Sequence, residues 1–320
     1  MKYRRLGGTE LDVSPICVGA MHAAGRKGTD DERTRQGKAA LRAALDDGVN
    51  CIHSSFEYSA RWMIGEVLKD HSKRTEVNHI IKVPVPDRPD GDRFDPKRFR
   101  ELIETALTEL RAERIAVLQW ITRFGPHTDE NRLVMLDRVL DDLRDTFSTL
   151  RDEGKVGYLF TFPYTLPYAR RAIETEAFSG LVGYYNLIET EMMEVFDEVV
   201  DHDMGFIVIR PFLAGTLTDK YSSPDVAPPG HRLRDPARAE HFARRAKILR
   251  ELPEAVGDSL TGFALRFTLA HPAVGTVITG MNTPQQVRQL LEAVEDDKEL
   301  PGAELVAEIR RISLQDAHAR

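Results

Sequence analysis

The sequence predicts an α/β fold, namely a closed (β/α)8 TIM barrel with an N-terminal β-hairpin and a C-terminal helical cap. Short apolar runs bounded by turn residues alternate with longer segments of helical period throughout the 320 residues. Eight such runs occur, and no composition break or linker rich in Gly and Ser divides them. This pattern favours a single domain over residues 1–320 and disfavours a doubly wound open sheet.

The predicted strands are continuous apolar runs, as expected for parallel strands that are covered on both faces. In chain order these runs are ICVGA (16–20), VNCIH (49–53), HIIKVPV (79–85), IAVLQWI (115–121), VGYLFTF (156–162), GLVGYYN (180–186), GFIVIR (205–210) and VGTVITG (274–280). Their carboxyl ends meet at one mouth of the barrel, where the active sites of this architecture lie.

Amphipathic segments between the strands carry apolar residues three and four positions apart, which predicts helices packed around the barrel. The clearest of these segments are 30–48, 99–113, 136–154 and 259–272. We expect the segment RRLGGTELDVS to form a hairpin that closes the barrel bottom. The stretch 218–255 and the tail from 300 depart from the repeat, and they predict a loop with an added helix and the C-terminal cap.

Charge and composition limit the classes of partner. The chain has 44 Lys and Arg residues against 51 Asp and Glu, and this formal charge of -7 disfavours nucleic-acid and anionic-membrane surfaces. The N-terminus has no signal-peptide pattern, and no apolar run reaches the ~20 residues that span a bilayer. We therefore expect a cytoplasmic protein that acts on a small-molecule substrate, with Cys17 and Cys51 as buried free thiols. The sequence indicates no oligomeric state.

Side chains at the predicted strand ends are the candidates for substrate contact. His22, Trp120, Arg123 and Arg210 lie there. A guanidinium group can hold a carboxylate or phosphate, and an aromatic ring suits an apolar ligand. The alternatives are a solvated loop position for His22 and ion pairs with Asp or Glu for the two arginines. The chain lacks a GxGxxG fingerprint, a Walker loop, a nucleophile elbow and a CxxC pair.

Several segments resemble the aldo-keto reductase family, in that family's order and spacing, over nearly the full chain. MKYRRLGGTELDVSPICVGA resembles its opening hairpin and first strand, ALDDGVNCIHSSFEYS its second strand and catalytic loop, and IIKVPV its third strand. RDEGKVGYLF is similar to the entry to its fifth strand, YYNLIE to its sixth strand, and IRPFLAGTLTDKY to its seventh strand and cofactor loop. The resemblance supports the barrel fold, whereas function must be argued from the site.

In that family an Asp, a Tyr, a Lys and a His form a catalytic tetrad, in which the Tyr donates a proton to the carbonyl. Carried over to this chain, Tyr58 and Lys82 match. The Asp position holds His53, and the His position holds Ile121, or Thr122 if the register slips by one. The resemblance therefore implies a degenerate tetrad.

The family's cofactor contacts are also incomplete. Phe162 and Pro163 replace the Ser-Asn pair that holds the nicotinamide, Val182 replaces a Gln, and Gln289 and Leu290 replace a Glu-Asn pair for the adenine. Each unpartnered buried amide costs about 1–3 kcal/mol. We therefore expect no cofactor, with NADP(H) as the alternative. If NADP(H) binds, the matching cofactor residues are Asn186, Pro211, Gly215 and Gln286.

The retained groups predict acid/base chemistry. Lys82 beside the phenol favours the phenolate and so lowers the Tyr58 pKa. A neutral His53 cannot compensate the lysine charge, so we expect these two groups to lower each other's pKa, which makes His53 a second proton-transfer candidate near neutral pH. Glu57 follows His53 by four residues, a spacing that suits a metal pair only on a helix, so no metal is expected.

Three hypotheses follow. The main one is isomerisation, epimerisation or dehydration of a small carbonyl compound, with Tyr58, Lys82 and His53 as the catalytic residues. The second is an atypical NADPH-dependent carbonyl reductase. The third is a catalytically inactive barrel that acts as a binding partner.

Overall fold

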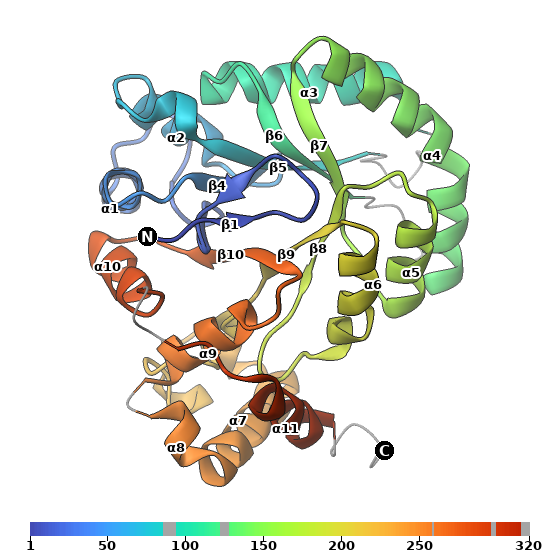
Figure 1. Cartoon of the computed structure of the whole chain (residues 1–320). Helices are drawn as coiled ribbons and strands as arrows, with labels where there is room; N and C mark the ends of the chain where they lie inside the picture. The colour runs from blue at the N-terminus through green and yellow to red at the C-terminus, as the bar shows by residue number, and fades with distance from the viewer. Residues whose placement is uncertain (86–93, 122–127, 258, 296–298, 315–320) are drawn as a thin grey trace.

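The structure is a computed structural model that describes residues 1–85, 94–121, 128–257, 259–295 and 299–314. Eight parallel strands form a closed barrel in the order β10, β3, β4, β5, β6, β7, β8, β9 (Figure 1). Their bounds are β3 Ile16–Gly19, β4 Cys51–Ser55, β5 Asn78–Pro84, β6 Ile115–Ile121, β7 Val156–Thr161, β8 Gly180–Tyr184, β9 Gly205–Ile209 and β10 Val274–Gly280. The predicted (β/α)8 barrel is confirmed, and every barrel strand overlaps the apolar run that predicted it.

Helices surround the barrel (Figure 1). Those between or after the strands are α1 Glu32–Asp46, α2 Arg61–Leu68, α3 Pro96–Leu110, α4 Asp129–Asp152, α5 Leu166–Glu174, α6 Phe196–Asp201, α9 Leu260–Leu269 and α10 Pro284–Glu292. Side-chain caps fix several starts: Asp31, Asp95 and Thr128 each accept a hydrogen bond from the backbone N–H three residues on. No described helix is long and apolar enough to cross a membrane.

The two irregular segments add helices outside the ring. After β9 the chain forms short 3-10 turns, then α7 Ala239–Glu251 and α8 Pro253–Val256, and the tail forms α11 Ala303–Leu314. Figure 1 shows these three helices gathered near α9, beyond the strands. The predicted added helix and C-terminal cap are therefore present.

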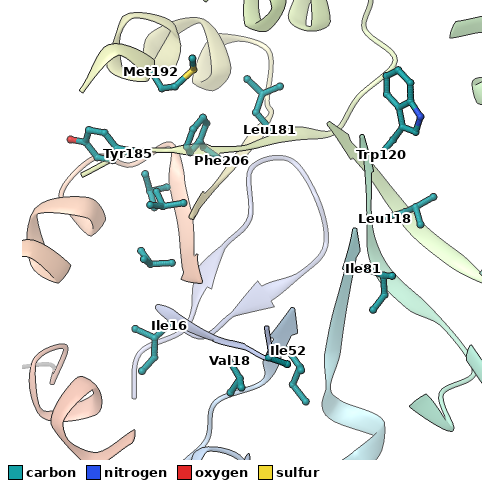
Figure 2. Packing of buried hydrophobic residues seen from close by; sticks show 14 of the residues in the cluster. Ile16, Val18, Ile52, Ile81, Leu118, Trp120, Leu181, Tyr185, Met192 and Phe206 are labelled. Carbon is teal, nitrogen blue, oxygen red and sulfur yellow. The ribbon is translucent and has the colours of Figure 1, made fainter. Parts of the chain in front are cut away.

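Two apolar layers hold the barrel, because alternate residues of each strand face opposite sides. Figure 2 shows the outward layer, which packs under the helices. Its labelled members include Val18, Ile52, Ile81, Leu118, Trp120 and Phe206. The inward layer fills the lower barrel with Cys17, Cys51, Ile80, Val117, Phe160, Val182, Ile207 and Ile278. Both cysteines are free and buried, as expected.

The N-terminal hairpin closes the lower end of the barrel. Its strands, β1 Arg4–Arg5 and β2 Asp12–Val13, pair antiparallel, and Leu6 and Val13 join the inward layer. Gly7 has φ 55°, and a Cβ there would lie 2.4 Å from the backbone N of Gly205. The turn therefore requires glycine to approach β9 this closely. The hairpin thus fills this end, which leaves the opposite mouth, where the strands end, as the expected place for a substrate.

Candidate active site

A layer of polar side chains lies above the inward apolar layer, toward the mouth. His53 on β4, Lys82 on β5 and Gln119 on β6 belong to it, and each is less than 10% exposed. The strand register sets Lys82 beside Ser55 on one side and Gln119 on the other. Three neighbouring strands thus direct their polar side chains into one space.

Lys82 and Tyr58 form the first contact at this mouth. Lys82 Nζ donates a hydrogen bond to the Tyr58 hydroxyl at 3.4 Å, and Nζ also lies 4.9 Å from the centre of the phenol ring. Tyr58 comes from the loop after β4, where its backbone N–H donates to the Ser55 carbonyl at 3.1 Å. A cation at this distance favours the phenolate over the phenol.

Glu57, the neighbour of Tyr58, forms an ion pair with the same ammonium group. Its Oε2 contacts Lys82 Nζ and lies 3.4 Å from Ser55 Oγ. The lysine side chain is 11% exposed and the glutamate side chain 34%. This contact corrects the assumption that Lys82 lacks a carboxylate partner: the strand position holds His53, but the following loop supplies the charge.

His53 is a neutral residue of this layer. Its Nε2 lies 3.3 Å from Gln119 Oε1, and its ring meets the Tyr58 ring edge to face at 6.0 Å. Burial, followed by the charge of Lys82, lowers the His53 pKa to about 4, despite the opposing hydrogen bond to Gln119. The predicted lowering is present for His53, but the expectation that it titrates near neutral pH is wrong, because desolvation disfavours its charged form.

The loop that carries Glu57 and Tyr58 is anchored by Arg61 at the start of α2. The guanidinium group hydrogen-bonds the Ser55 carbonyl, stacks 4.0 Å from the centre of the Phe56 ring, and pairs with Glu109 at 2.7 Å. These three contacts fix both ends of a short turn. The loop therefore holds its functional side chains against Lys82 with little freedom to move.

The opposite side of the mouth, at the ends of β7 and β8, is aromatic. Phe162 packs edge to face on Tyr164 at 4.8 Å and on Tyr184 at 5.2 Å, and Val182 is fully buried below them. Arg210 stacks 4.4 Å from the centre of the Tyr184 ring. This side offers ring faces where the family resemblance leads one to expect amide-binding groups.

The loop after β8 is organised by Asn186. Its Nδ2 donates to Glu189 at 2.7 Å and to the Arg210 carbonyl at 3.1 Å, while its Oδ1 accepts from two backbone N–H groups. Glu189 also pairs with Arg210 at 3.2 Å, and burial raises the Glu189 pKa. Asn186 is fully buried, and the hydrogen bonds of its side chain go to this loop and to the Arg210 carbonyl. Asn186 therefore supports Arg210 instead of contacting a ligand directly.

The loop after β9 is backbone-strained and surrounded by cations. Leu213, Ala214 and Gly215 have φ values of 44°, 64° and 109°, a left-handed run that is costly for the two non-glycine residues. Partial burial and the charges of Arg238 and Arg210 lower the pKa of Arg232. Such strain and such like-charge crowding are typical of places that bind a ligand of opposite charge.

Two further groups in this region are ready for a polar ligand. Among the described residues, Arg238 Nη1 and Asn282 Oδ1 are buried without a hydrogen-bond partner. Partial burial and the charges of Arg232 and Arg33 lower the pKa of His22, so Arg232 acts on His22 as well. Gln286 accepts a hydrogen bond from the Asn282 N–H at 2.9 Å and so shapes the turn before α10.

Other predicted residues have different outcomes. The expectation that Trp120 contacts substrate is wrong: its side chain faces outward, is fully buried, stacks on Phe178 and donates to the Val85 carbonyl at 2.6 Å (Figure 2). Arg123 lies outside the described residues. Pro211 is buried at the start of the strained loop, and Gly215 has the positive φ that its loop requires.

Sequence reasoning missed three features. It placed Glu57 near the strand ends and weighed it as a metal ligand, but it did not pair Glu57 with Lys82, although the position of Glu57 next to Tyr58 was a usable signal. Gln119 and the loop cations Arg232 and Arg238 were not singled out. The inward alternation of IAVLQWI could have identified Gln119, but contacts made across the barrel mouth leave no local pattern.

A barrel with a lysine-bound tyrosine and a cation-rich loop at one mouth defines an enzyme-type site for small molecules. A family model, the Aldo/keto reductase family, matches residues 15–312, and the chain belongs to this family.

Similar proteins agree with this assignment. The uncharacterized oxidoreductase YrpG of Bacillus subtilis (strain 168) is 27% identical over 327 residues, which cover 94% of each chain. L-galactose dehydrogenase of Arabidopsis thaliana is 22% identical over 306 residues, covering 92% of this chain and 89% of its own. The holo form of aldo-keto reductase AKR11C1 from Bacillus halodurans has a TM-score of 0.74 at 22% identity, covering 98% of this chain and 96% of its own. The expectation of a non-redox enzyme without a cofactor finds no support in these relatives.

Proposed function

We propose that this protein is an NADP(H)-dependent oxidoreductase that interconverts a carbonyl compound and its alcohol. The observation that carries the proposal is the hydrogen bond from Lys82 Nζ to the Tyr58 hydroxyl at 3.4 Å, at the mouth of an aldo-keto reductase barrel. The reaction needs a proton donor beside the carbonyl oxygen and a bound nucleotide across the mouth. The molecule offers groups for both.

Tyr58 is the proposed general acid. In the reductive direction its hydroxyl protonates the substrate oxygen, and in the oxidative direction the phenolate accepts the alcohol proton. Lys82 stabilises the phenolate, and general acid–base transfer of this kind contributes about 10²–10⁴-fold to the rate. His53, with a pKa of about 4, is uncharged at neutral pH and therefore adds no second positive charge beside Lys82.

The phosphate end of a dinucleotide fits the residues present. Arg232, Arg238 and the strained 213–215 loop would hold it, since buried Arg238 Nη1 has no partner among the described residues. The nicotinamide, when bound, supplies the hydride for the carbonyl carbon. At that end Phe162 offers a ring face for packing in place of hydrogen bonds.

A second candidate function uses the same acid/base pair without a cofactor. The side chains of Phe162 and the buried Val182 favour it, because neither offers a nicotinamide amide a hydrogen-bonding group. Tyr58 would then shift a proton next to a carbonyl, as in isomerisation or loss of water.

Calorimetric titration with NADPH separates the two functions. We expect a Kd of roughly 1–10 μM, that is, about 7–8 kcal/mol of binding free energy. Arg232→Ala should weaken binding about tenfold, because it removes a charge-assisted contact. Arg250→Ala is the matched control, since Arg250 is exposed and pairs only with the neighbouring Glu251 among its described ion pairs. No binding at millimolar NADPH would favour the cofactor-free function.

A further inference from the structure

The ammonium group of Lys82 needs a compensating charge that β4 does not supply. Lys82 is 9% exposed, and an unpaired buried ammonium is costly. On β4 the register partner of Lys82 is the uncharged Ser55, and the inward residue before it, His53, has a pKa of about 4 that leaves it uncharged at neutral pH. Gln119, on the other side, is uncharged as well. Among these neighbours, none fixes the lysine by charge.

We propose that Glu57 is the positioning residue of this site: its carboxylate holds the Lys82 ammonium against the Tyr58 hydroxyl. The proposal rests on the proposed function, in which Tyr58 transfers the proton. In this assignment the carboxylate that compensates the Lys82 charge, Glu57, lies on the loop before α2 and not on a barrel strand. The family's tetrad, as the resemblance gives it, has that carboxylate in the position of His53.

The loop geometry supports this assignment because one residue, Ser55, organises both functional neighbours. The Glu57 N–H donates to Ser55 Oγ at 3.2 Å, and the Tyr58 N–H donates to the Ser55 carbonyl at 3.1 Å. Arg61 binds that same carbonyl. Adjacent residues 57 and 58 thereby direct a carboxylate and a phenol to a single lysine nitrogen.

The electrostatic consequence has a defined sign. Among the described residues, the charged and titratable groups that act on Lys82 Nζ include Glu57 and Tyr58 from the loop and His53 from β4. An opposite charge nearby favours the charged form of a lysine. Loss of the Glu57 carboxylate should therefore lower the lysine pKa and release Nζ from Tyr58. Because Glu57 is one-third exposed, solvent screening keeps the effect moderate.

The first test measures the ionisation of Lys82 directly, by NMR of 13C-dimethylated lysine in the full chain, without cofactor. In Glu57→Gln we expect the Lys82 ionisation constant to rise about tenfold. Adding His53→Asp to that variant should reverse the change, since Asp returns the carboxylate to the strand. Glu66→Gln is the matched control, because Glu66 is an exposed carboxylate on α2 that pairs with Lys38 on α1, away from Lys82. An unchanged Lys82 ionisation in Glu57→Gln overturns the proposal.

The second test uses reduction of 4-nitrobenzaldehyde by NADPH as a probe reaction. Glu57→Gln should lower kcat about tenfold and change its pH profile, with the KM for NADPH unaltered, and Glu57→Asp should retain most activity. Equal loss in kcat and thermal stability in both variants would indicate a structural role and overturn the proposal. If the wild type does not reduce the probe, the proposed function fails, while the Lys82 measurement still decides the role of Glu57.

Discussion

The two sides of the barrel mouth differ in the chemistry they keep. The β4–β5 side holds a connected set of ionisable groups, in which Lys82 touches both Glu57 and Tyr58. The β7–β8 side presents packed rings, Phe162 and Tyr184, over an apolar layer. In the proposed function, proton transfer and cofactor contact would therefore fall to separate strands.

If Glu57 has the proposed positioning role, the β4–β5 side shows how a site can change the residue on a strand and still place a carboxylate beside its lysine. In this proposal a charge on β4 is replaced by a charge two residues after the strand ends, because the βα loop brings Glu57 against Lys82. Such a shift leaves barrel packing unaltered. The β7–β8 side has no equivalent substitution among its strand residues, so its binding energy must come from ring packing and from the cations of the next loop.

The largest expected effect is a loss of turnover when the proposed proton donor on the β4–β5 side is removed. Tyr58→Phe removes the proton donor and should lower kcat at least about 100-fold, because general acid–base transfer is worth about 10²–10⁴-fold. Tyr3→Phe is the matched control: it removes one hydroxyl, which bonds the Gly48 carbonyl at 2.9 Å, away from the mouth. Steady-state kinetics with the aldehyde probe measure both. Wild-type turnover by Tyr58→Phe would assign the proton to another group.

A smaller effect concerns the stability of that same side in acid. Burial lowers the pKa values of His53 and His79, on β4 and β5, from 6.5 to about 4. The unfolded chain therefore binds more protons than the folded chain between these values, and stability is full above pH 6.5 and falls as the pH drops toward 4. Between pH 7 and pH 5 each histidine should cost about 2 kcal/mol.

Urea unfolding at the two pH values measures this loss, and His79→Leu should reduce it by about half. Equal free energies of unfolding at pH 7 and pH 5 would show that the two rings are not held neutral by burial. The β7–β8 side carries no histidine on its strands, so its variants should leave the pH dependence as it is.

The sequence was a good guide to the barrel. A short apolar run such as IAVLQWI is a local pattern that predicts a strand buried on both faces, and β6 coincides with that run. The contact between Tyr58 and Lys82 was also expected, because both residues match a family motif. Local pattern and motif are both properties of short segments, which explains why they can be read before the fold is known.

The rest of the site depends on contacts between segments. The partner of Lys82 is 25 residues away along the chain, and only the register of β4 against β5 brings it close. The desolvation of His53 likewise follows from barrel closure, which no local pattern contains. Trp120 misled for the same reason: strand alternation, fixed by the register, turns it away from the mouth.

The most direct measurement of the central claim is isotope transfer. NADPH carrying deuterium at C4 of the nicotinamide, mixed with the protein and 4-nitrobenzaldehyde, should give an alcohol that holds deuterium on its carbinol carbon, detected by mass spectrometry. Both C4-labelled epimers are tested so that either face of the nicotinamide is covered. Deuterated alcohol from one epimer is the predicted result. Alcohol formed without deuterium from either epimer, or deuterium transfer that persists unchanged in Tyr58→Phe, would contradict the account.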